Sequence, residues 1–206
     1  MAHRWRKERP SFKRQLEAEL KGWGVTLAKT YTKIEAQRIK ALDAGDIEGA
    51  TSAAWHRVNI LVRQLMAEFG VTKPDAKPEN RQLFIDFMNW EGLEEMPYHQ
   101  ISAFLFAALA RRYANGQSGA PSRGTLNDFE AISAYSPYAD AMFLDRECAN
   151  LLSEEPLKSR LPIKGRVFSM SNKDDFIKYL RELNSSACEK TKSFASELYG
   201  LDQPIS

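Results

Sequence analysis

The 206-residue sequence lacks several features that define specialised classes of protein. It has only two cysteines, Cys148 and Cys188, which are too few for a disulfide framework or a cysteine-rich zinc site. The longest strongly apolar stretch, residues 101–110, is far shorter than the roughly 20 residues of a transmembrane helix. No signal-peptide pattern opens the sequence. We therefore expect a cytoplasmic protein that does not contact a membrane.

The sequence also lacks an excess of charge of either sign. Its 29 Lys and Arg residues nearly balance 27 Asp and Glu residues, so net charge does not by itself predict a nucleic-acid partner. With 43% hydrophobic residues, the chain is too apolar to be disordered. Eleven glycines and nine prolines are ordinary numbers and exclude a collagen-like or low-complexity chain. The length allows one core, or one core with a helical appendage.

The first third of the sequence predicts a helical hairpin over residues 11–70, within a region that spans residues 1–78. Apolar residues spaced by three and four form one stripe: Phe12, Leu16, Leu20, Trp23, Leu27, Tyr31 and Ile34. A second stripe runs through Ala50, Ala54, Val58, Leu61, Leu65 and Phe69. Gly45 and Asp46 lie between the stripes and supply a helix stop and an N-cap. The short joint predicts antiparallel helices.

Residues 79–206 predict an α/β region that forms one compact domain with the hairpin. Residues 126–184 alternate helix, strand, helix, strand, helix, with strands at 141–144 and 166–170. Right-handed crossovers would make this sheet parallel. We therefore predict a helix-rich α/β fold with a small parallel sheet. Two strands do not form a stable parallel sheet, so we expect further strands in residues 1–125 or an incomplete domain, and the helical pattern favours the second.

Three aspartates mark the α/β region: Asp128, Asp140 and Asp145. Asp145 follows the first strand, and the pair Asn127 and Glu130 predicts that the preceding helix opens beside Asp128. Clustered carboxylates favour a cation such as Mg²⁺ or Mn²⁺, which would support hydrolysis of a phosphodiester. The alternative is structural: Asp128 beside a helix dipole, Asp145 as an N-cap and Asp140 in a turn.

The segment LNDFEAISAYSPYADAMFLDRECANLL, followed by GRVFSMSNKDDFIKYLREL, resembles the C-terminal half of bacterial PIN-like domains. Those domains are α/β metal-dependent nucleases, found among RNase toxins and in RNA processing. The resemblance covers residues 94–184. It implies Asp128 and Asp145 as metal ligands and catalytic acids, with Asp140 as a weaker candidate. It also implies an endoribonuclease that uses Mg²⁺ or Mn²⁺ and has RNA as its partner.

The sequence departs from the PIN-like pattern at its start. PIN-like domains open with a strand that ends in the first metal-binding Asp, and an acid on the next helix follows. Here the chain enters a helix directly, and Glu17 or Glu19 is the candidate for the second acid. We therefore expect a truncated or degenerate PIN-like protein.

Basic residues supply candidates for contacts with the substrate phosphates: Arg111, Arg112 and Arg123. The basic N-terminus carries Trp5, which would stack on a base if this segment binds RNA, or belongs to a solvated helix end. A second hypothesis makes the chain a non-catalytic module derived from a PIN-like domain. Its hairpin of residues 11–70 would bind a protein partner, a second copy or nucleic acid through an exposed apolar stripe.

Overall fold

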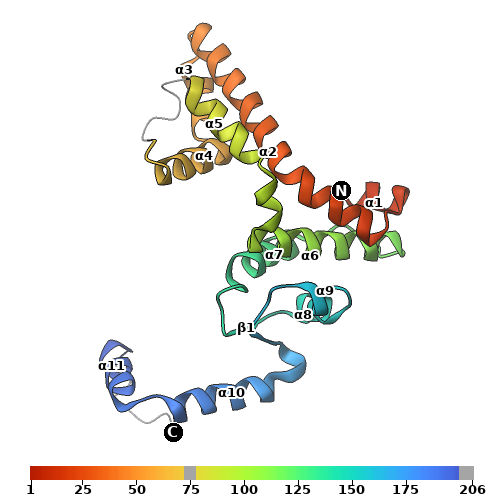
Figure 1. Ribbon diagram of the computed structural model, residues 1–206, viewed down its shortest axis with the longest axis vertical. Coiled ribbons are helices and arrows are strands. Elements are labelled where there is room, and N and C mark those ends of the chain that lie inside the picture. The colour runs from red at the N-terminus through yellow and green to blue at the C-terminus, as the bar shows by residue number, and fades with distance from the viewer. Residues whose placement is uncertain (72–77, 200–206) are drawn as a thin grey trace.

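The computed structural model describes residues 1–71 and 78–199, and 76% of the chain is helical. The helices of the first half are α1 (Ala2–Glu8), α2 (Phe12–Asp43), α3 (Ile47–Ala54), α4 (Arg57–Glu68), α5 (Pro78–Met88), the 3₁₀ helix η2 (Glu91–Glu95) and α6 (Pro97–Ala114). The second half comprises α7 (Arg123–Tyr135), β1 (Ala141–Phe143), α8 (Arg146–Ser153), α9 (Leu157–Arg160), β2 (Arg166–Phe168), η3 (Met170–Asn172), α10 (Lys173–Ser186) and α11 (Glu189–Tyr199). Figure 1 shows an elongated molecule with α2 and α6 at its centre.

The hairpin forms as predicted in its first arm and at its joint, but its second arm is broken. α2 is one helix of 32 residues, and Asp46 caps α3 by accepting a hydrogen bond from the Gly49 N–H. Between α3 and α4 the chain leaves the helical conformation at Trp55. His56 then caps α4, because its Nδ1 accepts a hydrogen bond from the Val58 N–H at 3.2 Å. The expectation of one continuous second helix is therefore wrong.

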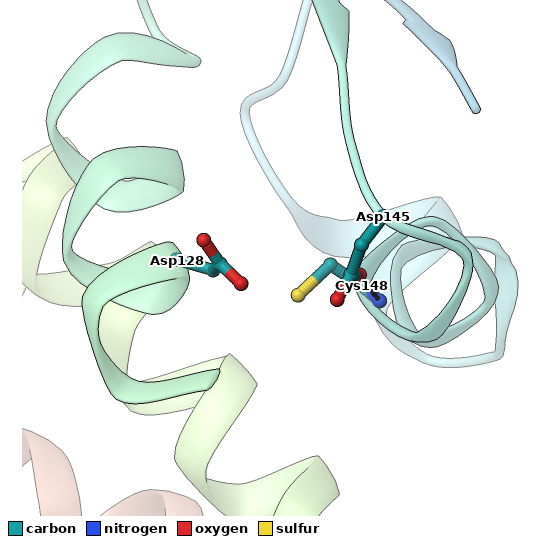
Figure 2. A group of neighbouring side chains, drawn as sticks. All are labelled: Asp128, Asp145 and Cys148. Atoms are coloured by element: carbon teal, nitrogen blue, oxygen red, sulfur yellow. Dashed lines mark hydrogen bonds between the residues drawn. The ribbon is translucent and has the colours of Figure 1, made fainter. Parts of the chain in front are cut away.

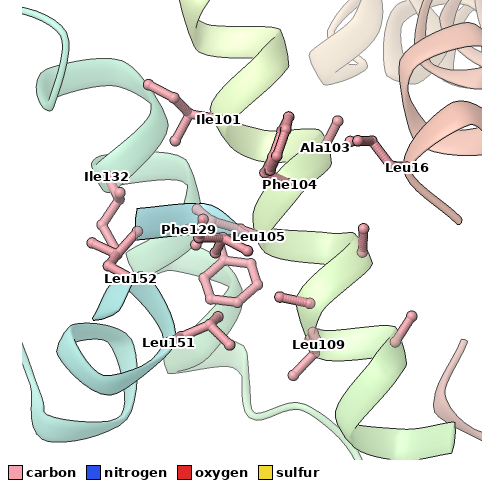
Figure 3. Packing of buried hydrophobic residues seen from close by; sticks show 14 of the residues in the cluster. Leu16, Ile101, Ala103, Phe104, Leu105, Leu109, Phe129, Ile132, Leu151 and Leu152 are labelled. Atoms are coloured by element: carbon pink, nitrogen blue, oxygen red, sulfur yellow. The ribbon is translucent and has the colours of Figure 1, made fainter. Parts of the chain in front are cut away.

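Two separate hydrophobic cores lie along α2. The first core surrounds α6 and contains, among others, Trp5, Leu16, Ile101, Leu105, Leu109, Phe129, Ile132, Leu151 and Leu157. Figure 3 shows α6 between α2 on one side and α7 and α8 on the other. The second core contains Ala28, Tyr31, Val62, Met66, Phe84, Met88 and Leu93, from α2, α4, α5 and η2.

The apolar stripe of α2 is covered by the chain itself. Leu16 belongs to the first core and Tyr31 to the second, and Ile34 is also buried. At these positions the structure contradicts the exposed stripe that the second hypothesis requires. The stripe of the second arm is only partly covered, because Ala50 is buried whereas Leu61 and Phe69 are exposed.

β1 and β2 pair in parallel, with Met142 opposite Val167 and Phe143 opposite Phe168. This confirms the small parallel sheet, and it is the whole of the strand structure in the described parts of the chain. Met142 and Val167 pack on the first core. The rings of Phe143 and Phe168 lie on the opposite face, 5.0 Å and 5.2 Å from the Phe176 ring of α10. The two strands therefore link the first core to α10.

Candidate metal centre

Asp145 lies just after β1 and begins α8. One of its oxygens, Oδ1, accepts a hydrogen bond from the Cys148 N–H at 2.6 Å, which satisfies a donor that the helix start leaves without a partner. The structural alternative for Asp145, an N-cap, is therefore real. A capping aspartate uses one carboxylate oxygen, so its second oxygen and its charge stay available to a ligand.

Asp128 lies in the second turn of α7, not at its beginning. The helix starts at Arg123, where the Ser122 Oγ accepts a hydrogen bond from the Thr125 N–H at 2.9 Å. The predicted opening of this helix at Asn127 is therefore wrong. Because the helix dipole acts mainly within the first turn, it does not explain a carboxylate at position 128. Asp128 instead points across the gap toward α8 (Figure 2).

The structure brings Asp128 and Asp145 together with a third side chain, that of Cys148. One ligand atom from each of these residues lies within 4.8 Å of the other two. Figure 2 shows the Asp128 carboxylate facing the Cys148 sulfur, with Asp145 beside it at the start of α8. We refer to Asp128, Asp145 and Cys148 as the acidic cluster. Its residues come from α7 and from the start of α8, which contact each other and both pack on α6.

Cys148 is the member that the sequence reasoning missed. Its side chain is 1% exposed, and the pKa of its thiol is raised from 9.0 to about 12, most of all by burial. A hydrogen bond to Asp145 and the negative charges of Asp145, Asp128 and Glu147 contribute to the same shift. The available signal was local: Cys148 lies three residues after an N-cap and shares a helix face with Leu151 and Leu152.

The structure does not bring Asp140 to the acidic cluster. Asp140 precedes β1, and its backbone carbonyl accepts a hydrogen bond from the Arg166 N–H at 2.9 Å. Asp145 follows the other end of the same strand, and at about 3.3 Å per residue the two lie on the order of 15 Å apart. Glu17 and Glu19 of α2 also lie outside the cluster, and Glu19 accepts a hydrogen bond from Gln15.

Two of the arginines expected to meet substrate join α6 to α8 instead. Arg111 and Arg112 both pair with Glu154, with N–O distances of 3.1 Å and 2.7 Å. Arg112 also lies 3.7 Å from Glu147, the neighbour of Cys148. Both guanidinium groups therefore hold α8 in place. Arg123, the first residue of α7, is exposed to solvent.

The basic N-terminal segment does not present Trp5 to a base. Its side chain is fully buried in the first core, with its ring 6.0 Å from that of Tyr113. The possibility of base stacking at Trp5 is therefore excluded. The segment forms α1, which contacts α6, so this burial anchors the N-terminal residues to the body of the protein.

The donors of the acidic cluster fit a divalent cation. Two carboxylates from different helices suit Mg²⁺ or Mn²⁺, which take oxygen ligands and keep several waters. The thiol adds no charge to the site at neutral pH, because a thiol with the ordinary pKa of 9.0 is already protonated there and burial raises this pKa. A softer ion such as Mn²⁺ tolerates sulfur better than Mg²⁺ does. The carboxylate pair is therefore the part of the cluster that would hold the ion.

Comparisons with known proteins found no relative of this chain. No protein-family model matches the chain, and no curated protein or solved structure does so either. Among the described residues, none of the helices is both long enough and apolar enough to cross a membrane.

Proposed function

We propose that this chain is a PIN-like, metal-dependent ribonuclease-type protein that holds a divalent cation at its acidic cluster. One observation carries the proposal: Asp128 and Asp145, separated in the sequence by the rest of α7, a turn and β1, place their carboxylates within 4.8 Å. Like charges at this distance repel each other unless a cation or a proton lies between them. The resemblance of residues 94–184 to PIN-like domains supports the nuclease chemistry.

The two aspartates of the cluster and Arg123 each have a part in this proposal. Asp128 and Asp145 would hold Mg²⁺ or Mn²⁺, which when bound would activate a water molecule and neutralise the phosphate oxygens of RNA. The cap that Asp145 forms on α8 fixes the direction of its carboxylate before any ion arrives. Arg123 is exposed in the first turn of α7 and is the predicted substrate residue that stays open to a phosphate.

A titration with Mn²⁺ tests the cation site. We expect saturable binding by the native chain and at least tenfold weaker binding by Asp128→Asn and Asp145→Asn, measured by isothermal titration calorimetry. Asparagine caps helices as well as aspartate does, so Asp145→Asn removes the charge but keeps α8. Asp140→Asn is the matched control, because it removes the same charge at the far end of β1 and should bind like the native chain.

Cleavage of a labelled single-stranded RNA tests the nuclease part of the proposal. Cleavage should require Mn²⁺ or Mg²⁺ and should be lost in Asp128→Asn but kept in Asp140→Asn. Equal Mn²⁺ binding by all four proteins would overturn the cation site. Binding that depends on the cluster without any cleavage would keep the site and overturn the nuclease activity of this chain.

A further inference from the structure

A groove of about 500 Å³ lies between β2 and the α8–α9 segment. Its lining includes Gly165, Val167 and Ser169, which alternate along β2 and its two ends. None of the three residues of the acidic cluster lines the groove, so it is a second surface with its own chemistry. It goes beyond the proposed function, which makes no use of it.

β2 lines this groove and has unused backbone hydrogen-bonding groups on the side away from β1. The Arg166 N–H donates to the Asp140 carbonyl at 2.9 Å, and the Phe168 carbonyl accepts from the Leu144 N–H at 2.8 Å. These bonds point residues 166 and 168 toward β1, so the alternate residue, Val167, points its N–H and C=O away from β1. In the described parts of the chain no further strand pairs with that side of β2. Such an edge is a template for another strand.

The open part of this edge is short. The Ser169 N–H is already bonded, because it donates to the Asn172 Oδ1 at 2.7 Å as part of the capping box that begins η3. Gly165 begins the edge, and a Cβ there would lie 2.2 Å from the Ala139 carbonyl oxygen. The free backbone groups are therefore those around Val167, which is room for a segment of a few residues.

The side chains that line the groove indicate which side chains a bound segment would need. Leu152, Leu157, Leu161 and Ile163 give it an apolar wall. Lys158 of α9 lies at the same groove, is exposed, and has no ion-pair partner among the described residues. An occupant with an apolar side chain for the wall and a carboxylate for Lys158 would complement both features.

We propose that this groove binds a short, extended, acidic segment of a partner protein, which adds to the sheet as a third strand beside β2. The main chain of the segment bonds to the Val167 N–H and C=O. One of its apolar side chains packs on Leu157 and Leu161, and its carboxylate faces Lys158. The directional bonds of a strand edge favour an extended peptide over a compact small molecule, which satisfies only part of that edge.

A synthetic seven-residue peptide with valine and glutamate two residues apart and threonine at the positions between them is the probe, because residues two apart lie on the same face of a strand. We expect its fluorescein conjugate to bind the native chain in a polarisation assay, with amide shifts in NMR spectra centred on Gly165 and Val167. Val167→Pro removes the outward N–H but no bond to β1, so it should weaken binding at least tenfold. Lys158→Glu, an exposed change, should weaken binding several-fold, and a lysine version of the peptide should restore it.

Several outcomes would overturn the proposal. One is the absence of peptide binding, and another is a set of amide shifts that avoids β2. Equal binding by the native chain, Val167→Pro and Lys158→Glu would be a third. A concentration-dependent dimer that Val167→Pro abolishes, seen in sedimentation equilibrium, would assign the groove to a second copy of this chain instead. Binding of Mn²⁺ at the acidic cluster should be the same in both variants, so the two proposals fail separately.

Discussion

Asp145 and Cys148 depend on each other through both backbone and side chain. The carboxylate of Asp145 accepts the Cys148 N–H, and the thiol lies beside that same carboxylate. The hydrogen bond that begins α8 therefore also places the Cys148 sulfur in the acidic cluster. Because the thiol is buried among carboxylates, its titration reports directly on the integrity of the cluster.

The pKa of Cys148 makes the stability of the fold depend on pH. The folded chain holds the thiol proton up to about pH 12, whereas the unfolded chain releases it near the ordinary pKa of 9.0. The folded state is therefore not penalised by this thiol below pH 9. As the pH rises above 9, ionisation of the thiol in the unfolded chain lowers the free energy of unfolding. Between pH 8 and pH 10, the native chain should lose about 1.4 kcal/mol more unfolding free energy than Cys148→Ala does.

Urea unfolding of both proteins at the two pH values measures this difference. Burial also raises the pKa of Tyr98 and Tyr113, but both proteins keep these residues, so their contribution cancels. Any cavity left by Cys148→Ala lowers the unfolding free energy equally at both pH values and cancels as well. The same dependence on pH in both proteins would show that the thiol ionises alike in the folded and unfolded chains.

Two glycines two residues apart in α2 have opposite surroundings. A Cβ at Gly24 would lie 1.9 Å from the Met88 carbonyl oxygen at the end of α5, whereas a Cβ at Gly22 meets no atom within 4 Å. Gly24 therefore permits α2 and α5 to approach closely, and Gly22 only lowers the helix propensity of α2.

Alanine at these two positions should change stability in opposite directions. Gly24→Ala should destabilise the fold by roughly 2 kcal/mol or more, because backbone atoms must move to admit the methyl group. Gly22→Ala should stabilise it by about 1 kcal/mol through helix propensity. Thermal unfolding followed by circular dichroism measures both changes. A Gly24→Ala protein as stable as the native chain would contradict the close approach of α2 to α5.

The whole molecule is unevenly packed from one end to the other. Its two cores lie along α2 and α6, whereas neither α10 nor α11 has a buried side chain. Both helices extend away from the helical body in Figure 1, and Leu180, Leu183 and Phe194 are exposed. Because helices this short depend on packing for their stability, α10 and α11 should open at a lower free energy than α6 does.

Hydrogen exchange followed by mass spectrometry should show this gradient. We expect amides of α11 to exchange within seconds, those of α10 to be only partly protected, and those of α6 to exchange only when the whole protein unfolds. Slow exchange in α11, equal to that in α6, would mean that another surface covers these helices in solution.

The sequence predicted the elements whose signals lie within a few residues of one another. Both strands of the sheet, the long helix α2 and the Asp46 cap of α3 belong to this group. The same kind of local signal gave a wrong start for α7. Asn127 and Glu130 have the spacing of a capping pair, but they lie inside a helix whose N-cap is Ser122. Periodicity also could not show the break before His56, since the apolar stripe continues across it.

Tertiary packing alone decided the acidic cluster and the groove. The spacing of Asp128 and Asp145 suggested that they meet, but only the approach of α7 to α8, both packed on α6, placed Cys148 between them. The predicted strand at 141–144 already placed Asp140 before it and Asp145 after it, whereas the burial of Trp5 could not be predicted from the sequence. Helix periodicity and capping are short-range properties, whereas these contacts join residues far apart in the chain through a shared core.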